Sequence, residues 1–116
     1  MEEPRRPKPK PVYWRGTSRA DLRAFPEEAR HEAGAQLWSV QCGEPPDDFK
    51  YLGEIGSGVY EIRIRTQVEH RVFYIAKFAE AVYVLHAFEK RTRKTNTRDL
   101  EIARRRYNEL VRERRH

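Results

Sequence analysis

The sequence predicts an α+β domain in which a helical hairpin and a C-terminal helix pack on a mostly antiparallel, twisted sheet. Two observations predict it. Apolar residues recur every three or four positions in the first third and again in the last stretch of the chain, and between them they alternate with charged residues. The length of 116 residues fits a single small domain with one core.

The N-terminal segment 1–10 is predicted to be a disordered, basic, proline-rich tail. Its prolines block both a helix and a central strand, and apart from Met1 it has no apolar side chain to bury. The folded domain is therefore expected to span residues 11–116. It opens with a short strand at 12–15, which Gly16 ends.

Two consecutive helices are expected next. Ser18 is interpreted as the N-cap of a short helix whose small apolar face is formed by Leu22 and Phe25. Pro26 is expected to begin the second helix, at a position where proline is favoured. The apolar stripe of this helix consists of Ala29, Ala33, Leu37 and Val40. The tight junction between the two helices predicts a hairpin.

Three strands are predicted in the centre of the chain, at 59–65, 70–78 and 81–88. The first alternates apolar and charged residues, which is typical of a strand with one buried and one solvated face. The third contains the continuous apolar run 82–85, which fits a strand buried on both faces. Because the connections are short, neighbouring strands are expected to pair antiparallel.

The segment 98–114 is predicted to be an amphipathic helix whose polar face is mostly arginine. Its consecutive arginines, Arg104–Arg106, raise the alternative of a DNA-binding helix. The apolar stripe instead indicates a helix docked on its own domain, and no helix-turn-helix pairing is evident.

Charge and composition restrict the class of partner. The net charge of +6 favours polyanions or an acidic protein. Cys42 is the single cysteine, and the four histidines lack the spacing of metal ligands, so neither a metal nor a cofactor is expected. No apolar run has the length of a membrane span, and a cytoplasmic protein with no membrane partner is expected.

The predicted strands carry basic residues that could converge on one sheet face, because adjacent strands lie only about 4.8 Å apart. The expected patch contains Arg63, Arg71, His86 and Lys90, with Phe88 and either Tyr60 or Tyr74 nearby. Such a face suits an RNA backbone and a stacked base. The alternative stays open that these cations only solvate the surface and that His86 is a hydrogen-bonded core residue. His70 is expected to be exposed at a turn.

Several short motifs, in this order and spacing, resemble the HigB-like, phage-derived branch of the RelE toxin superfamily. The motifs are Gly58-Val-Tyr-Glu-Ile-Arg63, His70-Arg-Val-Phe-Tyr74, Tyr83-Val-Leu-His-Ala-Phe-Glu-Lys90, Arg93-Lys94-Thr95, and Asp99 followed by Ala103 and Arg106. The resemblance covers residues 11–112. It implies a type II toxin that inhibits translation as a metal-independent endoribonuclease, an mRNA interferase that cuts mRNA on the ribosome. It also implies a cognate helix-turn-helix antitoxin, through which alone operator DNA would be bound.

The resemblance also implies roles for individual residues. The residues carried over as catalytic are Arg63, Arg71, Lys90 and His86, and those expected to bind RNA are Arg65, Phe88, Arg93 and Lys94. The two catalytic arginines would clamp phosphate through their planar guanidinium forks, and His86 could serve as a base at neutral pH. RelE has a second lysine where this chain has Glu61, so a two-lysine site is not available.

Two consequences follow for function. Substitution of Arg71 by alanine is expected to abolish cleavage and to leave folding intact. The alternative function is a non-catalytic RNA- or ribosome-binding module, that is, a degenerate toxin.

Overall fold

The computed structural model describes residues 8–115. Its elements follow the chain as β1 (Val12–Trp14), α1 (Ser18–Arg23), α2 (Glu27–Gln41), β2 (Phe49–Tyr51), β3 (Val59–Arg65), β4 (Glu69–Ile75), β5 (Val82–Glu89) and α3 (Thr97–Arg114). The predicted α+β class, with a helical hairpin before the sheet and a helix after it, is confirmed.

The five strands form one sheet in the order β1-β5-β4-β3-β2. The pairs within β2 to β5 are antiparallel, as their short connections predict, and only β1 pairs parallel, with β5. β1 reaches only as far as Val84, so the second half of β5 has no strand beside it on that side. The edge strand β2 was not predicted, because its three exposed residues are too few to show alternation.

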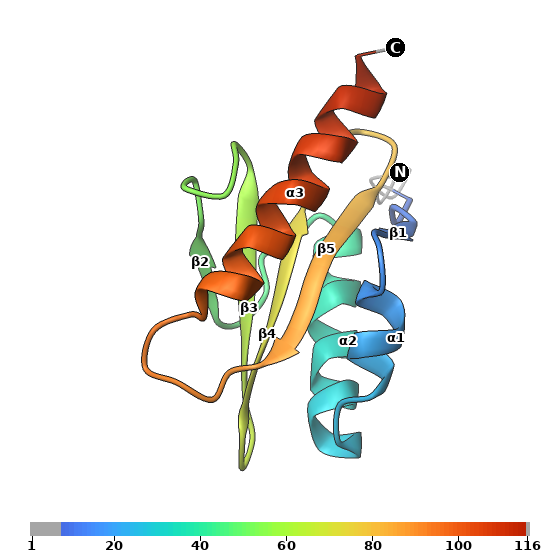
Figure 1. Cartoon of the computed structure of the whole chain (residues 1–116). Helices are drawn as coiled ribbons and strands as arrows, with labels where there is room; N and C mark the ends of the chain where they lie inside the picture. The colour runs from blue at the N-terminus through green and yellow to red at the C-terminus, as the bar shows by residue number, and fades with distance from the viewer. Residues whose placement is uncertain (1–7, 116) are drawn as a thin grey trace, which may run out of the picture.

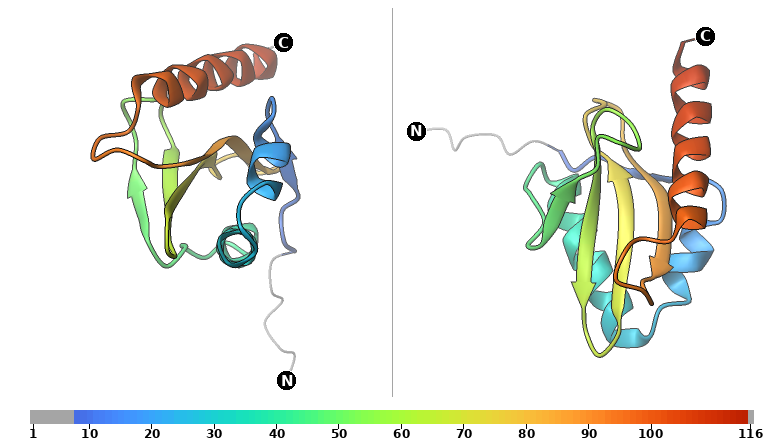
Figure 2. Two further views of the ribbon diagram at one scale, coloured as in Figure 1. Left: turned by 60° about the horizontal axis from the view of Figure 1, so that its bottom comes forward. Right: turned by 60° about the vertical axis from the view of Figure 1, so that its left-hand side comes forward.

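The sheet lies between two helical layers (Figure 1). α1 and α2 cover one face and α3 crosses the other, as Figure 2 shows in both views. β5 is therefore buried on both faces, and every residue of 82–88 is buried. The same arrangement corrects one expectation: β3 has no fully solvated face, and Glu61 on its supposedly wet side is only 3% exposed.

Each helical layer closes its own part of the core. Between the sheet and the hairpin lie, among others, Phe25, Leu37, Ile62, Ile64, Val72 and Val84. Between the sheet and α3 lie, among others, Val59, Phe73, Ile75, Leu85, Phe88, Ala103 and Leu110. These two sets follow the alternation of side chains along the strands, and the second set fixes α3 over the sheet.

Helix starts differ slightly from the expected positions. The N-cap of α1 is Thr17, and Ser18 is already helical and buried; its hydroxyl donates to the carbonyl oxygen of Val84 at 3.0 Å. Pro26 is the N-cap of α2 rather than its first helical residue. A buried hydroxyl needs an acceptor, and for Ser18 the nearby β5 backbone supplies it.

Most of the predicted tail, residues 1–7, lies outside the described part of the chain. Lys10, just after it, is held by the domain: its backbone N–H donates to Gln41, and its ammonium donates to the carbonyls of Ala76 and Phe78 at 2.7 and 2.9 Å. Within residues 8–115, none of the helices has both the length and the apolar character needed to cross a bilayer.

Candidate functional site

The strand register places most of the predicted site residues on the face that α3 covers. Arg63 of β3 lies opposite Arg71 of β4, which in turn lies opposite Phe88 of β5. His86 lies one row further along, opposite Phe73, whose ring belongs to the α3-side core. Tyr60 and Tyr74, which were candidates for base stacking here, contribute to the opposite core and face α2 instead.

A β-bulge is the reason that His86 faces α3. The register with β4 jumps between Phe73, which pairs with His86, and Tyr74, which pairs with Val84, so Leu85 has no partner. The extra residue turns His86 to the same side as Leu85. Its ring then stacks on Phe88, with ring centroids 5.0 Å apart.

The arginines of β3 and β4 are committed to carboxylates. We call this set the arginine–carboxylate cluster; its members are Arg63, Arg65, Arg71, Asp48, Glu61 and Glu69. Arg71 is 5% exposed and donates to Glu61 and Glu69, at 2.6 Å each. Its Nε is the single buried side-chain polar atom without a partner in the described residues. The cluster has three cations and three carboxylates, so it carries no excess positive charge.

This pairing changes the expectation for Arg71. A guanidinium buried between two carboxylates can bind phosphate only if at least one of these ion pairs opens, and separating a buried ion pair is costly. Removing Arg71 would leave Glu61 buried and facing only Arg63. The Arg71→Ala variant is therefore expected to lose stability as well as any activity, contrary to the prediction from sequence.

His86 is bonded on one side and faces a cation on the other. Its Nε2 lies 2.7 Å from Oδ1 of Asp99 in α3, and its Nδ1 lies 3.5 Å from a guanidinium nitrogen of Arg106. Because arginine only donates, Nδ1 must be the acceptor and Nε2–H must donate to Asp99. Burial lowers the pKa of His86, against the opposing effect of Asp99. His86 is thus a neutral link between β5 and α3.

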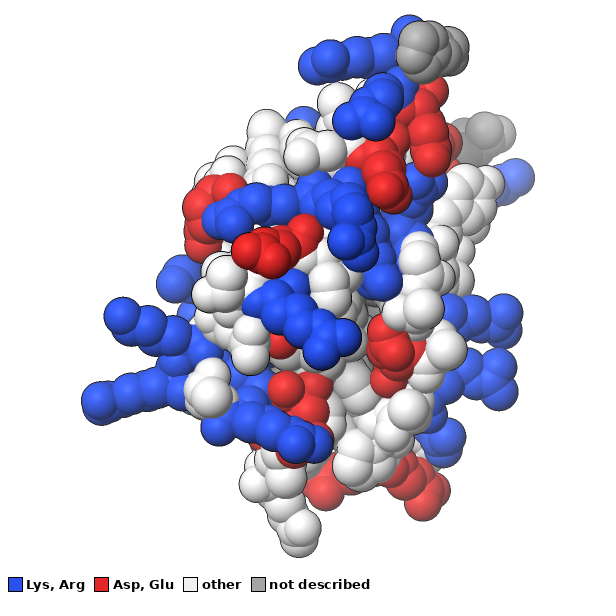
Figure 3. Space-filling model, in the orientation of Figure 1, with Lys and Arg blue, Asp and Glu red and all other residues white. Residues whose placement is uncertain are grey.

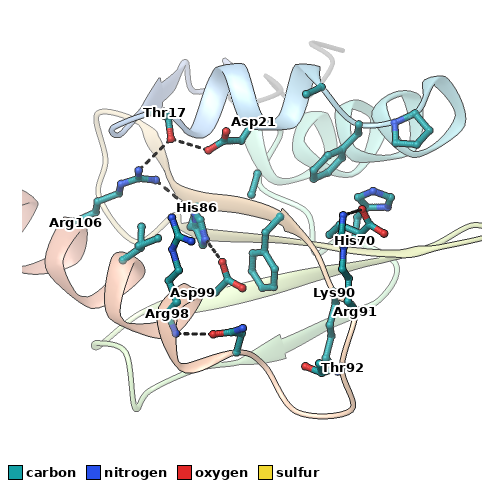
Figure 4. A pocket seen from close by; sticks show the side chains of 18 residues that line it. Thr17, Asp21, His70, His86, Lys90, Arg91, Thr92, Arg98, Asp99 and Arg106 are labelled. Atoms are coloured by element: carbon teal, nitrogen blue, oxygen red, sulfur yellow. Dashed lines mark hydrogen bonds and ion pairs between the residues drawn. The ribbon is translucent and has the colours of Figure 1, made fainter.

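Arg106 extends this link to α1. Its guanidinium donates to the carbonyl of Leu85 at 2.9 Å and to the hydroxyl of Thr17 at 3.1 Å, and Thr17 donates to Asp21. Burial lowers the pKa of Arg106. Together these contacts seat α3 against β5 and α1. The dashed lines in Figure 4 show the bonds from His86 to Asp99 and from Arg106 to Thr17.

A cleft of about 610 Å³ opens beside this network, between α1, the unpaired half of β5 and the start of α3 (Figure 4). Three of the predicted site residues, His86, Phe88 and Lys90, contribute to its lining. The arginines of β3 and β4 do not. The patch expected from the sequence is therefore divided between the cleft and the arginine–carboxylate cluster.

A group of cations lies at the mouth of the cleft, in the segment 90–98, which we call the cationic loop. It contains Lys90, Arg91, Arg93, Lys94 and Arg98. Among the described residues, only Arg91 of these forms an ion pair, with Glu89 at 3.4 Å. Lys90 donates to the backbone carbonyl of Arg93. In Figure 3 the basic side chains project at the lower left, where Figure 1 shows this loop.

Four residues of this region were not singled out from the sequence as site residues: Arg91, Arg98, Asp99 and Arg106. One signal was available, because Arg98, Ile102 and Arg106 recur every four residues and so share one face of the helix. The pattern could not show that this face points to the open edge of β5.

Residues 8–115 contain no cluster of three or more histidine, cysteine, aspartate or glutamate side chains that could hold a metal ion. His70, expected at an exposed turn, is buried against Phe25, with ring centroids 4.3 Å apart. It lies inside β4, because that strand already begins at Glu69.

The chain matches the family model described as phage derived protein Gp49-like (DUF891) over residues 20–108, from α1 into the second half of α3. This is a type II toxin family related to the RelE-like toxins. No curated protein is similar enough to the chain to count as a match. The matched segment includes the strands β2 to β5, the cationic loop and most of α3, and it leaves out β1. The chain therefore belongs to the phage-derived Gp49-like family.

Proposed function

We propose that this protein is the toxin of a type II toxin–antitoxin pair and that it inhibits translation by cutting mRNA on the ribosome in the cytoplasm. The observation that carries the proposal is the cationic loop beside the cleft. Its lysines and arginines, Arg91 apart, have no carboxylate partner in the described residues, so they can bind phosphates without first breaking an ion pair. The family and the net charge of +6 agree with this function.

The reaction that we propose depends on positive charge close to the phosphate that is attacked. The 2′-oxygen of the RNA forms a bond to the adjacent phosphorus, and the bond from phosphorus to the 5′-oxygen breaks. The 2′-OH proton passes to a base, and the leaving 5′-oxygen receives a proton from an acid. The products are a cyclic phosphate and a 5′-OH end. The pentacovalent intermediate carries extra negative charge, which Lys90 and Arg98 at the cleft are placed to stabilise.

His86 is the histidine that we propose as the base, and burial lowers its pKa, which favours the neutral imidazole that can accept a proton. The geometry nevertheless sets a condition. To accept the 2′-OH proton, its Nδ1 would have to be released from Arg106, which lies 3.5 Å away. We therefore propose that His86 first serves as a positioning residue that holds Asp99 and α3 in place. Arg63, Arg65 and Arg71 would join phosphate binding only when a pair in the arginine–carboxylate cluster opens.

A cognate antitoxin is part of the proposal. An acidic surface or segment of a helix-turn-helix protein encoded beside the toxin would cover the cationic loop and so block the access of RNA. Contact with operator DNA would then occur through the antitoxin alone. α3 supports this division, because its apolar side is packed on the sheet by Ala103 and Leu110.

A growth and cleavage assay in a bacterial host tests the function. The test variant is the triple substitution Arg93→Gln, Lys94→Gln and Arg98→Gln, and its control is Arg23→Gln, Arg30→Gln and Arg112→Gln, which removes the same charge from exposed positions elsewhere. Induction of the wild type should arrest growth and create new 5′ ends within translated codons. The control should behave like the wild type, and the loop variant should lose at least tenfold in cleavage.

One observation supports a second function, that of a non-catalytic binding module: Arg71 and His86 both form hydrogen bonds to neighbouring side chains. A non-catalytic RNA- or ribosome-binding module would need no free base. In the same assay, such a module would bind ribosomes through the cationic loop without producing new 5′ ends. Wild-type protein that arrests growth but leaves mRNA intact would support this function against the nuclease.

A further inference from the structure

A row of aromatic side chains crosses the sheet on the side away from α3. Phe49 and Tyr51 of β2, Tyr60 of β3 and Tyr74 of β4 share this face, with Tyr60 at the centre of the row. The ring of Tyr60 lies 6.0 Å from that of Phe49, 5.1 Å from that of Tyr51 and 6.0 Å from that of Tyr74.

Part of this row is open to solvent. Phe49 is 44% exposed and Tyr51 is 52% exposed. Beside them lies a groove of about 530 Å³, formed where the loop after α2 passes the sheet; its lining includes Pro45, Pro46, Phe49, Tyr60, Tyr74, Lys10 and Lys77. We call this surface the aromatic groove. Neighbouring exposed aromatic rings are unfavourable in water and mark a binding surface.

The polar groups of the groove favour an anionic partner. Neither Lys10 nor Lys77 forms an ion pair with a described residue. The ammonium of Lys10 donates to two backbone carbonyls, which leaves one of its three protons for a ligand. Glu44 is the single acidic residue in the lining.

The tyrosine hydroxyls add donors to this surface. Burial, together with the neighbouring phenol of Tyr60, raises the pKa of Tyr74 to about 12, so this hydroxyl keeps its proton at neutral pH. Within residues 8–115 neither hydroxyl, of Tyr60 or of Tyr74, has a hydrogen-bond partner, and neither oxygen is fully buried, because Nε of Arg71 is the single buried side-chain polar atom without a partner there. Both can therefore donate to an anionic or hydroxyl-bearing ligand.

We propose that the aromatic groove is a second binding surface for single-stranded RNA, which stacks bases on Phe49, Tyr51 and Tyr60 and places phosphates near Lys10 and Lys77. Aromatic rings beside cations bind single strands with little sequence preference, because every base has a face to stack. The groove has no lining residue in common with the cleft, so RNA bound here is separate from the cleft. The choice of RNA as the polyanion rests on the proposed function.

Binding of RNA that cannot be cut tests the proposal independently of catalysis. The probe is a fluorescein-labelled, single-stranded decamer with 2′-O-methyl riboses, which lack the attacking hydroxyl, and the readout is its anisotropy with the full chain. The double variant Phe49→Ser and Tyr51→Ser removes the exposed rings. Its control, Tyr13→Ser and Trp38→Ser, removes two rings that are 49% and 54% exposed on other surfaces.

The groove variant should bind the decamer about tenfold or more weakly for each ring that stacks a base, and the control should stay within about twofold of the wild type. The Lys77→Gln variant, which leaves every ring in place, should lower the slope of log K against log salt by about 0.7, because one phosphate of the single strand is no longer neutralised. Urea unfolding of each variant shows that the fold is kept.

Equal affinity of the wild type and the groove variant, equal losses in both double variants, or no binding of the decamer by the wild type would overturn the proposal. The proposal would also be overturned if the groove variant bound RNA as tightly as the wild type but lost binding to a protein partner. Because the probe cannot be cleaved, a protein that never cuts mRNA could still pass this test. A protein that cuts mRNA normally after loss of the rings, with unchanged affinity for the decamer, would refute the groove alone.

Discussion

Removal of the charge on Glu61 is expected to destabilise the fold, because this buried carboxylate holds two arginines. It accepts from Arg71 at 2.6 Å and from Arg63 at 3.1 Å, and Arg71 is buried as well. Breaking a buried pair by removing one partner costs about 3–5 kcal/mol. Arg71 keeps its contact with Glu69, so we expect the lower end, about 3 kcal/mol, for Glu61→Gln.

A double-mutant cycle separates this interaction from the effect of each substitution. The free energy of unfolding in urea is measured for Glu61→Gln, Arg71→Gln and the two combined, and the coupling is expected to be about 1.5–3 kcal/mol. The matched cycle on the exposed pair Glu89 and Arg91, 3.4 Å apart, should give below about 0.5 kcal/mol. Couplings that agree within error would refute the claim that burial makes the Glu61–Arg71 pair structural.

Three further predictions concern α3 and its neighbours. Leu110, which is 2% exposed, fills the core under α3, so Leu110→Ala should cost about 2–5 kcal/mol in urea unfolding, while the half-buried Val111→Ala should cost under about 1.5 kcal/mol. Gly16 has a φ of +55°, and a Cβ there would lie 2.4 Å from Nε of Arg106, so Gly16→Ala should lower the melting temperature. A Cβ at Gly34 in α2 would meet no atom within 4 Å beyond its own helix backbone and chain neighbours, so Gly34→Ala should raise it slightly. Burial keeps the folded-state pKa of His86 below its unfolded value, so its contribution to stability is complete above about pH 6.5 and is lost as the pH falls through the folded pKa. The free energy of unfolding from pH 8 to 5 should therefore fall more steeply for the wild type than for His86→Gln, and equal slopes would contradict this.

Much of the fold could be predicted from hydrophobic period alone. The stripe of α2, the alternation in β3 and the apolar run in β5 each give an element at nearly the observed place. β2 could not be found in this way, because three exposed residues carry no period. The solvated face expected for β3 was wrong at Glu61 and right at Arg65, which stays exposed. Alternation shows which residues differ in polarity, but it cannot show that Glu61 is buried in ion pairs with Arg63 and with Arg71 of the next strand.

The site was less predictable because it depends on tertiary contacts. The bulge in β5 decides which way His86 points, and no local signal in the sequence marks it. The role of Arg71 depends on Glu61 ten residues away, and the cleft brings together α1, the end of β5 and the start of α3. What the sequence did show is that the loop after β5 is basic, and among the described residues only Arg91 of its cations forms an ion pair.

Cleavage of a reporter mRNA by the purified full chain, with and without translating ribosomes, tests the proposed function most directly. The 5′ ends are mapped by primer extension, and urea unfolding shows that the protein is folded. We expect new 5′ ends within codons when ribosomes translate the message, none on the free mRNA, and at least tenfold less cleavage by the Arg93→Gln, Lys94→Gln and Arg98→Gln variant. An intact message in the presence of folded protein and active ribosomes would contradict it.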